Sequence, residues 1–401
     1  MSFYTYHARV LCSTCCNCSP LQSNLEEKND TYMTQNRGTI HSPLSVVGWL
    51  LLFAIFPMVR GRAILSANAA KAAGFYIETP LLAAATSSAR FGGLNIKLKM
   101  ENLQPSGSFK DRGIGNMIQS LSDGASISRL ISSSGGNAGL SVATIGQKVG
   151  IPVDVFVPVT TLPMMIAKMK QRNANVYVGG ENWNAADILA RKAVADDLGA
   201  RYIPPYDNPL IWDGHSTIID ELKNSLTESE KPDVIVLSVG GGGLLAGIQQ
   251  GLDRAGWSDT RIIAVETEGA ASFAAAHAVG AVVKLEKIST IASSLGALSV
   301  TAAVLDRTSQ AVLMTEPMVV TDAEAVSACL QFADEQRFLV EPACGACLAA
   351  VYSARCRDLL IAGGKGKEAM NVVVIVCGGS VVNIDLMQKW KKDFTIHSET
   401  Q

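Results

Sequence analysis

Short runs of Val, Ile and Leu alternate with amphipathic stretches along most of this 401-residue chain, from about Phe75 onward. The apolar runs predict strands over residues 94–100, 129–133, 153–157, 175–178, 234–239, 261–266 and 372–377. Most of these runs are continuously apolar, which is typical of strands that are covered on both faces. Strands that alternate with helices in this way predict an α/β protein with parallel sheets.

Two of the intervening stretches, AGLSVATIGQKVG and NWNAADILARKAVADDLG, have the spacing of amphipathic helices. In the second stretch the apolar positions recur near helical spacing. They are Ala185, Ile188, Leu189, Ala193, Val194 and Leu198. We therefore expect these side chains to form the apolar face of a helix.

Residues 1–70 form an N-terminal extension whose composition differs from that of the rest of the chain. It contains Cys12, Cys15, Cys16 and Cys18, and the apolar run VVGWLLLFAIF at 46–56. No His or second CxxC follows the cysteines at a zinc-ligand spacing, so we do not expect a metal site there. The apolar run is shorter than the roughly 20 residues of a membrane-spanning helix. Three interpretations stay open: a dispensable extension, a targeting segment or membrane anchor, and an integral structural element.

Composition limits the class of ligand. The formal net charge is −2 and no long basic run occurs, so nothing points to nucleic acid or to an anionic surface. A small neutral or zwitterionic ligand is the expected partner. The remaining cysteines are spread through an apolar C-terminal third, as in reduced cytosolic proteins, and we expect a cytoplasmic location.

A run of four glycines is the strongest local signal in the chain. In VIVLSVGGGGLLAG a buried strand ends, Gly240, Gly241, Gly242 and Gly243 follow, and a helix begins. Without Cβ atoms, several backbone N–H groups can converge on one anion at the positive end of a helix. The spacing is not the GxGxxG of a dinucleotide site, and the chain contains no P-loop motif. The loop is therefore predicted to bind a single phosphate.

A lysine with an unusual position supplies the second signal. In ENLQPSGSFKDRG, Lys110 stands at a predicted strand-to-helix junction among small residues. A partly desolvated lysine has a lowered pKa and can attack a carbonyl to form a Schiff base. A further loop, SSSGGNAG at 132–139, is suited to a carboxylate or to an ordinary helix cap. An aldehyde and a phosphate occur together in pyridoxal phosphate (PLP), which is the cofactor these features suggest.

Five motifs occur in an order that resembles a known family. They are SGSFKDRG, SSSGGNAG, SVGGGGLL, LVEPACGA and VVIVCGGS, and the similarity runs from about Phe75 to Met387. The chain resembles the serine/threonine dehydratase group of the tryptophan-synthase-β-like, fold type II PLP enzymes. The resemblance implies a two-domain, three-layer α/β/α fold with twisted, parallel-rich sheets. The large PLP-binding domain would comprise 71–104 and 207–401, the small substrate-binding domain 105–206, and the cofactor would lie in the cleft between them.

The resemblance also assigns cofactor-binding residues. Lys110 would be the catalytic, Schiff-base lysine, with Phe109 packed beside the cofactor ring. Asn137 would hydrogen-bond the 3′-oxygen of the cofactor, and Cys377 would face its pyridine nitrogen as a neutral thiol, which suits elimination over transamination. The phosphate would be bound by Gly240, Gly241, Gly242, Gly243 and Leu244.

Substrate and cation sites follow from the same resemblance. The substrate carboxylate would contact the loop of Ser134, Gly135, Asn137 and Ala138. A monovalent cation such as K⁺ would be held near Glu266, Ala270 and Ser272. Two departures stand out: liver-type serine dehydratases have alanine where this chain has Gly135, and a small apolar residue where it has Ser294. The first widens the pocket floor and leaves the relative rates on serine and threonine open.

The activity implied is an α,β-elimination that converts L-serine to pyruvate and ammonia, and L-threonine to 2-oxobutanoate. Two alternatives within the enzyme class are a cysteine synthase and a biosynthetic threonine deaminase. From a different class, the chain could be a catalytically silent or membrane-tethered PLP-binding protein. Members of the family are usually homodimers, so we expect a homodimer.

Overall fold

A computed structural model describes residues 69–84, 93–122, 126–309, 313–363 and 369–394 of the chain. These residues fall within one compact unit, 54–401. The four N-terminal cysteines and the apolar run 46–56 lie outside the described residues. Within the described part, no helix combines the length and apolar character that a bilayer crossing requires.

The larger of two sheets in the described residues has the strand order β1-β2-β10-β7-β8-β9. Its strands are β1 (Leu81–Ala83), β2 (Asn95–Lys99), β7 (Val234–Ser238), β8 (Arg261–Thr267), β9 (Thr315–Val320) and β10 (Asn371–Ile375). β1 is antiparallel to β2, and the other neighbouring pairs are parallel. Every residue of β7 and β8 is buried, as expected for strands covered on both faces.

The smaller sheet is parallel throughout and has the order β5-β4-β3-β6. Its strands are β3 (Arg129–Ser132), β4 (Val153–Val157), β5 (Asn175–Val178) and β6 (Ala200–Tyr202). All four come from one continuous stretch of the chain, whereas the larger sheet combines strands that precede and follow it. The α/β class with two parallel-rich sheets, predicted from the sequence, is confirmed.

Three strands were not predicted. β1 and β6 have three residues each, too few to show a pattern. β9 contains Pro317, which cannot donate a backbone hydrogen bond, but β9 pairs only with β8 at the edge of its sheet, where proline is tolerated.

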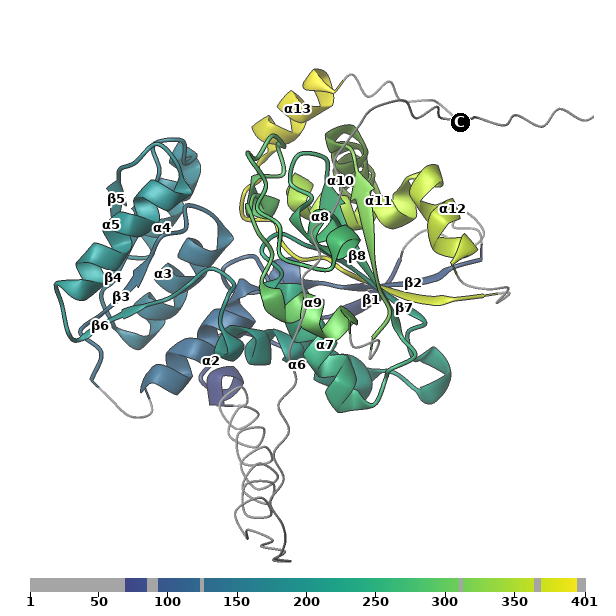
Figure 1. The fold of residues 1–401 in the computed structure, drawn as a ribbon, viewed down its shortest axis with the longest axis horizontal. Coiled ribbons are helices and arrows are strands. Elements are labelled where there is room, and N and C mark those ends of the chain that lie inside the picture. Colours follow the sequence, from purple (N-terminus) through teal and green to yellow (C-terminus); the bar gives the residue numbers. More distant parts are fainter. Residues whose placement is uncertain (1–68, 85–92, 123–125, 310–312, 364–368, 395–401) are drawn as a thin grey trace, which may run out of the picture. The chain divides into compact units, whose positions relative to one another are not determined.

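Helices cover the sheets (Figure 1). They are α2 (Lys110–Ser122), α3 (Asn137–Val149), α4 (Pro163–Gln171), α5 (Trp183–Ala195), α6 (Pro209–Ser225), α7 (Gly243–Ala255), α8 (Ser272–Val279), α9 (Ala302–Ser309), α10 (Asp322–Gln336), α11 (Pro342–Tyr352), α12 (Ala354–Ala362) and α13 (Ile384–Asp393). Figure 1 shows α10, α11 and α12 on one side of the larger sheet and α6 and α7 on the other. Every residue of α11 is buried, and this helix packs on β7, β8 and β10.

The apolar face expected for α5 is wrong in part. Ala193 and Val194 do pack against the smaller sheet, but Ile188 is 68% exposed and Leu198, beyond the helix end, is 96% exposed. Ala186 and Ala190 are fully buried instead, because small side chains let the helix approach the sheet closely.

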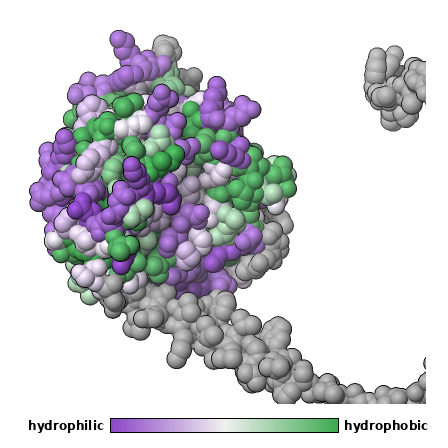
Figure 2. Space-filling view, turned by 60° about the vertical axis from the view of Figure 1, so that its left-hand side comes forward, coloured by the Kyte–Doolittle hydropathy of each residue, from purple (hydrophilic) through white to green (hydrophobic). Residues whose placement is uncertain are grey.

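On the face in Figure 2, hydrophobic residues lie in several patches separated by hydrophilic ones.

A buried cluster of four charges anchors α2. Arg112, two residues after Lys110, is fully buried, and its guanidinium donates at 2.7 Å to both carboxylate oxygens of Glu101 and of Glu221. The buried Lys99 ammonium also donates to Glu221, at 2.6 Å. Two cations and two anions therefore compensate one another in the interior, as buried charges require. The cluster links β2, the following 3₁₀ turn, α2 and α6.

Candidate active site

Lys110 is the first residue of α2 and follows a loop of small residues. Its side chain is half-buried, and its Nζ donates a hydrogen bond to the carbonyl oxygen of Pro205 at 2.6 Å. Burial lowers the pKa of the Lys110 amine to about 8, although nearby Cys377 and Glu341 act in the opposite direction. At neutral pH this amine is thus neutral far more often than that of an ordinary lysine, whose pKa is about 10.4.

The loop before Lys110 is fastened to the end of β10. The N–H of Phe109 donates to the carbonyl oxygen of Cys377 at 3.0 Å, and the N–H of Gly379 donates to the carbonyl oxygen of Gly107 at 3.0 Å. Gly107 has φ +88°, in the left-handed region that favours glycine. Two motifs far apart in the chain, SGSFKDRG and VVIVCGGS, therefore form one structural unit.

The ring of Phe109 lies between Lys110 and a buried histidine. Its centroid is 4.9 Å from Lys110 Nζ, and the His215 ring meets it edge-on at 4.8 Å. Burial, with Lys110 and Arg112 nearby, lowers the pKa of His215 well below its usual value. His215 therefore packs as a neutral ring that supports Phe109.

Asn137, the first residue of α3, is held by an acidic residue that the sequence analysis gave no role. Its Nδ2 donates to Glu341 Oε1 at 2.8 Å and to Ser294 Oγ at 3.4 Å. Glu341 Oε2 accepts from the backbone N–H of Val381 at 3.0 Å, and burial raises the pKa of Glu341. Among the described residues nothing donates to Asn137 Oδ1, although that atom is buried. The amide thus retains an unused acceptor.

The glycine loop lies between the end of β7 and the start of α7. The backbone N–H groups from Gly240 to Leu244 donate to no acceptor in the described part of the protein. Gly242 has φ +88°. A Cβ atom at Gly241 would lie 2.4 Å from the ring of Tyr206, so a larger residue would displace that ring. Free N–H groups at a helix N-terminus are an anion-binding arrangement.

The loop predicted to contact the substrate carboxylate precedes α3 and includes Ser134, Gly135 and Ala138. Gly136 N–H donates to Ser134 Oγ at 3.3 Å. Gly135 faces Thr161: a Cβ atom at Gly135 would lie 2.5 Å from Thr161 Oγ1. Thr161 therefore occupies the space that a methyl group on residue 135 would fill, and the expectation that Gly135 widens the pocket floor is wrong on this side of the loop.

Cys377 follows β10 and lies beside two further buried thiols. A hydrogen bond with Cys344 favours its thiolate. The neighbouring Cys347 and burial outweigh this effect and raise the pKa of Cys377 well above its usual value. Cys377 is thus a neutral thiol.

The group expected to hold a cation lies between the end of β8 and the start of α8. Glu266 accepts from the backbone N–H groups of Phe273 at 2.7 Å and Ala274 at 2.8 Å, and burial raises the pKa of Glu266 to about 7. Ser272 Oγ donates to the carbonyl oxygen of Gly240 at 3.5 Å. Ala270, in the turn before α8, is fully buried. These residues therefore adjoin the glycine loop.

Close approaches show that the separate motifs meet. A Cβ atom at Gly378 would lie 3.2 Å from Cβ of Ser108 and 3.6 Å from Asn137 Nδ2. A Cβ atom at Gly240 would lie 3.2 Å from the carbonyl oxygen of Ser294. The structure therefore brings together the N-termini of α2 and α3, the end of β10 and the glycine loop.

Sequence reasoning missed Glu341, the carbonyl oxygen of Pro205 and the ring of Tyr206. Glu341 stands within LVEPACGA, one of the five motifs quoted for the resemblance, but the contacts of all three residues join segments that are distant in the chain. A carboxylate directly before a proline and an apolar helix, as in EPACGACLAA, was a usable signal for Glu341, because such a charge is buried only with partners.

The chain was compared with known proteins. A family model described as "Pyridoxal-phosphate dependent enzyme" matches residues 73–378. Human "L-serine dehydratase/L-threonine deaminase" is 44% identical over 313 residues, which cover 78% of this chain and 93% of that protein. Human "Serine dehydratase-like" is 43% identical over 325 residues, covering 81% of this chain and 97% of that protein. The crystal structure of a fungal L-serine ammonia-lyase from Rhizomucor miehei superposes with a TM-score of 0.74 at 36% identity, covering 80% of this chain and 99% of that one.

Proposed function

Because the chain belongs to the family of pyridoxal-phosphate dependent enzymes, we propose that it is a PLP-dependent L-serine ammonia-lyase that also accepts L-threonine. The observation that carries the proposal is the convergence of Lys110, Asn137 and the glycine loop beside the neutral thiol of Cys377. The similarity to serine dehydratases over most of the chain supports this substrate class.

The residues present fit PLP. The N–H groups of Gly240 to Leu244, which donate to no acceptor among the described residues, suit its phosphate, and the Lys110 amine suits its aldehyde. Asn137 Oδ1, to which nothing donates among the described residues, can accept a hydrogen bond from the ring hydroxyl of the cofactor. Phe109 and Cys377 complete the set, as a packing surface and as a neutral partner for the pyridine nitrogen.

Catalysis requires a base that can take a proton from the substrate Cα. When bound, PLP supplies an aldehyde that captures the substrate amine and a conjugated ring that withdraws the electron pair left on Cα. Lys110 Nζ is the base: its pKa of about 8 lets it be neutral at working pH and still hold the proton that it removes. This pKa is low because burying the charged ammonium form of Lys110 costs free energy.

The remaining residues bind and orient. The N-terminus of α3, with Ser134, Gly135 and Ala138, binds the substrate carboxylate, since the helix presents N–H groups and a partial positive charge there. Glu341 accepts from Asn137 and from the backbone of Val381, so it fixes the direction of the Asn137 amide. Glu266, Ala270 and Ser272 would hold a monovalent cation next to the glycine loop, which Ser272 contacts through the carbonyl oxygen of Gly240.

Product analysis tests the proposal. The full-length protein, supplied with PLP and K⁺, is expected to release pyruvate and ammonia in equal amounts from L-serine, and 2-oxobutanoate and ammonia from L-threonine. D-serine serves as the control substrate. Sulfide-dependent cysteine formation from an activated serine, with no keto acid from either amino acid, would replace elimination by β-replacement as the function.

The lowered pKa of Lys110 predicts how cofactor capture depends on pH. Only the neutral amine attacks an aldehyde, so protein stripped of PLP should recapture it about tenfold faster per pH unit below 8 and level off above that pH. The measurement is the rate at which the absorption of bound cofactor returns. A rate that climbs without levelling to about pH 10 would mean an ordinary lysine.

Gly135 offers a test of the substrate loop. Gly135→Ala should lower kcat/KM for L-serine by about 10- to 100-fold, because the new methyl group is forced against Thr161 and the loop shifts. Thr161→Ala in the same chain removes the obstruction and should restore most of the activity, and Thr161→Ala alone is the control. A double variant as slow as Gly135→Ala would show that the loss has another cause.

We further propose a cytoplasmic homodimer. All five described cysteines are free, which suits a reducing compartment. Full-length protein and a chain that begins near Ala69 should both fractionate with the cytosol, show equal activity, and scatter light with twice the mass of one chain. Recovery of only the full-length protein with membranes would indicate an anchor in residues 1–68.

A further inference from the structure

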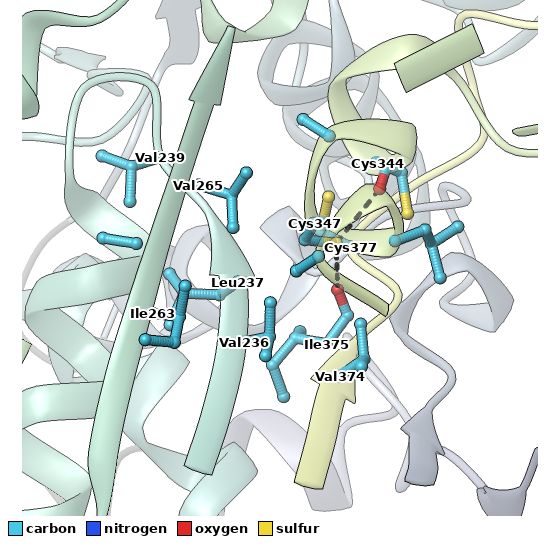
Figure 3. Close-up of a cluster of buried hydrophobic side chains, with 14 of the residues drawn as sticks. Val236, Leu237, Val239, Ile263, Val265, Cys344, Cys347, Val374, Ile375 and Cys377 are labelled. Carbon is cyan, nitrogen blue, oxygen red and sulfur yellow. Dashed lines mark hydrogen bonds between the residues drawn. The ribbon is translucent and has the colours of Figure 1, made fainter. Parts of the chain in front are cut away.

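Three buried thiols face one another where α11 passes the end of β10 (Figure 3). Cys344 and Cys347 stand one turn apart near the start of α11, and Cys377 follows β10. Their sulfur atoms all lie within 4.8 Å of one another, and all three residues are buried. Two of them form a CxxC pair, in CGAC, to which the proposed reaction gives no role.

The distances between the three sulfur atoms are close to those between three sulfur ligands of one metal ion. Three sulfurs around one ion at a Zn–S distance of about 2.3 Å are about 4 Å apart. The cluster would contract by less than about 1 Å to reach that geometry. Cys356, by contrast, is a buried cysteine outside this group.

Burial raises the pKa of Cys344 well above the usual value of a thiol, and positive charge near the cluster offsets part of this effect. Cys344 stands in the first turn of α11, where the positive end of the helix favours a thiolate. Lys110 lies close enough to Cys377 for their charges to interact, while the nearby carboxyl of Glu341 acts in the opposite direction and raises the pKa of Cys377. The N–H of Cys347 donates to Ser238 Oγ at 3.1 Å, so the backbone there is fixed.

The thiols hold protons that a metal ion would replace. Cys347 Sγ donates to the carbonyl oxygens of Cys344 at 3.1 Å and Ile375 at 3.2 Å. Binding replaces the S–H bonds of the protonated thiols by metal–sulfur bonds and releases their protons to solvent. Cys377 is 6% exposed while the other two are fully buried, so an ion would reach the cluster past Cys377.

We propose that Cys344, Cys347 and Cys377 form a binding site for one soft, closed-shell metal ion, of the class of Zn²⁺ or Cu⁺. Three thiolates select such ions over Mg²⁺ or Ca²⁺. Occupancy takes the proton from Cys377, the thiol proposed to face the cofactor, and therefore inhibits the enzyme. The inhibition rests on the proposed function, whereas metal binding itself does not.

The test uses Cd²⁺ as the probe metal. Full-length protein in which Cys12, Cys15, Cys16 and Cys18 are changed to serine avoids binding by the extension. This protein should develop thiolate-to-metal absorption in the ultraviolet that saturates at one Cd²⁺ per chain, with the release of protons as each ion binds. Mg²⁺ should produce neither signal.

Variants locate the site. In the same background Cys347→Ala should weaken Cd²⁺ binding by about 100-fold, because one of three ligands is lost, while Cys356→Ala should bind as before. X-ray absorption of the Cd²⁺-loaded protein should count three sulfur neighbours and needs no variant. No absorption on titration, unchanged binding in Cys347→Ala, or fewer than three sulfur neighbours would overturn the proposal.

Discussion

Replacement of Lys110 by alanine should reduce keto-acid formation by at least about 10⁴-fold, since the variant lacks both the amine that holds the cofactor and the base that takes the Cα proton. The fold should survive, because Lys110 Nζ donates one hydrogen bond, to Pro205, while the adjoining loop is held by backbone bonds to the end of β10. The measurements are pyruvate release from L-serine, circular dichroism, and the visible absorption of bound cofactor, which should be lost.

Lys148→Ala is the matched control. Its Nζ also donates to a backbone carbonyl oxygen, that of Gly74, at 2.8 Å, but at an exposed position. Its activity should equal that of the unmodified protein. A Lys110→Ala protein that still turned over at the normal rate would remove Lys110 from the mechanism.

Replacement of Arg112 by methionine should lower the free energy of unfolding by about 3–5 kcal/mol, the largest stability effect that we expect from a single side chain. Without the guanidinium, the carboxylates of Glu101 and Glu221 stay in the interior with Lys99 as the remaining cation of the cluster. Glu101 would keep hydrogen bonds from Thr79 and Gln104 but lose its cation, and a buried carboxylate without a cation is costly because water no longer solvates it. Chemical denaturation followed by circular dichroism measures the loss.

Arg254→Met is the control that distinguishes the stability effect of burial from that of losing an ion pair. Arg254 donates to Asp220 at 2.7 Å, but the two side chains are 24% and 43% exposed. The expected loss of unfolding free energy is below about 1 kcal/mol, as for other exposed pairs. Equal losses in the two variants would show that the buried cluster contributes no more than a surface pair.

The features that the sequence predicted well are those set by neighbouring residues. Continuous apolar runs identified β7 and β8, which are buried throughout. The glycine loop was predicted from its position between a strand and a helix. The structure explains why glycine is needed there: Gly241 packs against the ring of Tyr206, and Gly242 has a positive φ. Local chemistry and local backbone geometry suffice for such elements.

The features that the sequence did not predict depend on contacts between distant segments. Helical spacing alone predicted that Ile188 belongs to the apolar face of α5. The buried residues are instead Ala186 and Ala190, because the helix lies close to the sheet and only small side chains fit between them. Glu341 acquires its role only because the fold brings Asn137 to it. Arg112 likewise finds its partners in another turn and another helix.

The cluster of Cys344, Cys347 and Cys377 also depends on contacts between distant segments. Cys344 and Cys347 are close in sequence, but Cys377 joins them only because α11 packs on β10. The N-terminal CxxC, which lies outside the described residues, is equally visible in the sequence, whereas nothing in the sequence places Cys377 beside Cys344 and Cys347.

The central claim is that Lys110 carries the cofactor in the site formed by α2, α3, β10 and the glycine loop. Borohydride reduction of the PLP-loaded protein fixes the cofactor to the lysine that holds it, and mass spectrometry of the resulting peptides locates that lysine. We predict a single modified peptide, with the added mass on Lys110. Lys168, whose pKa is also lowered by burial, is the competing candidate. Modification of Lys168 or of any other lysine, with Lys110 unmodified, would contradict this account of the site.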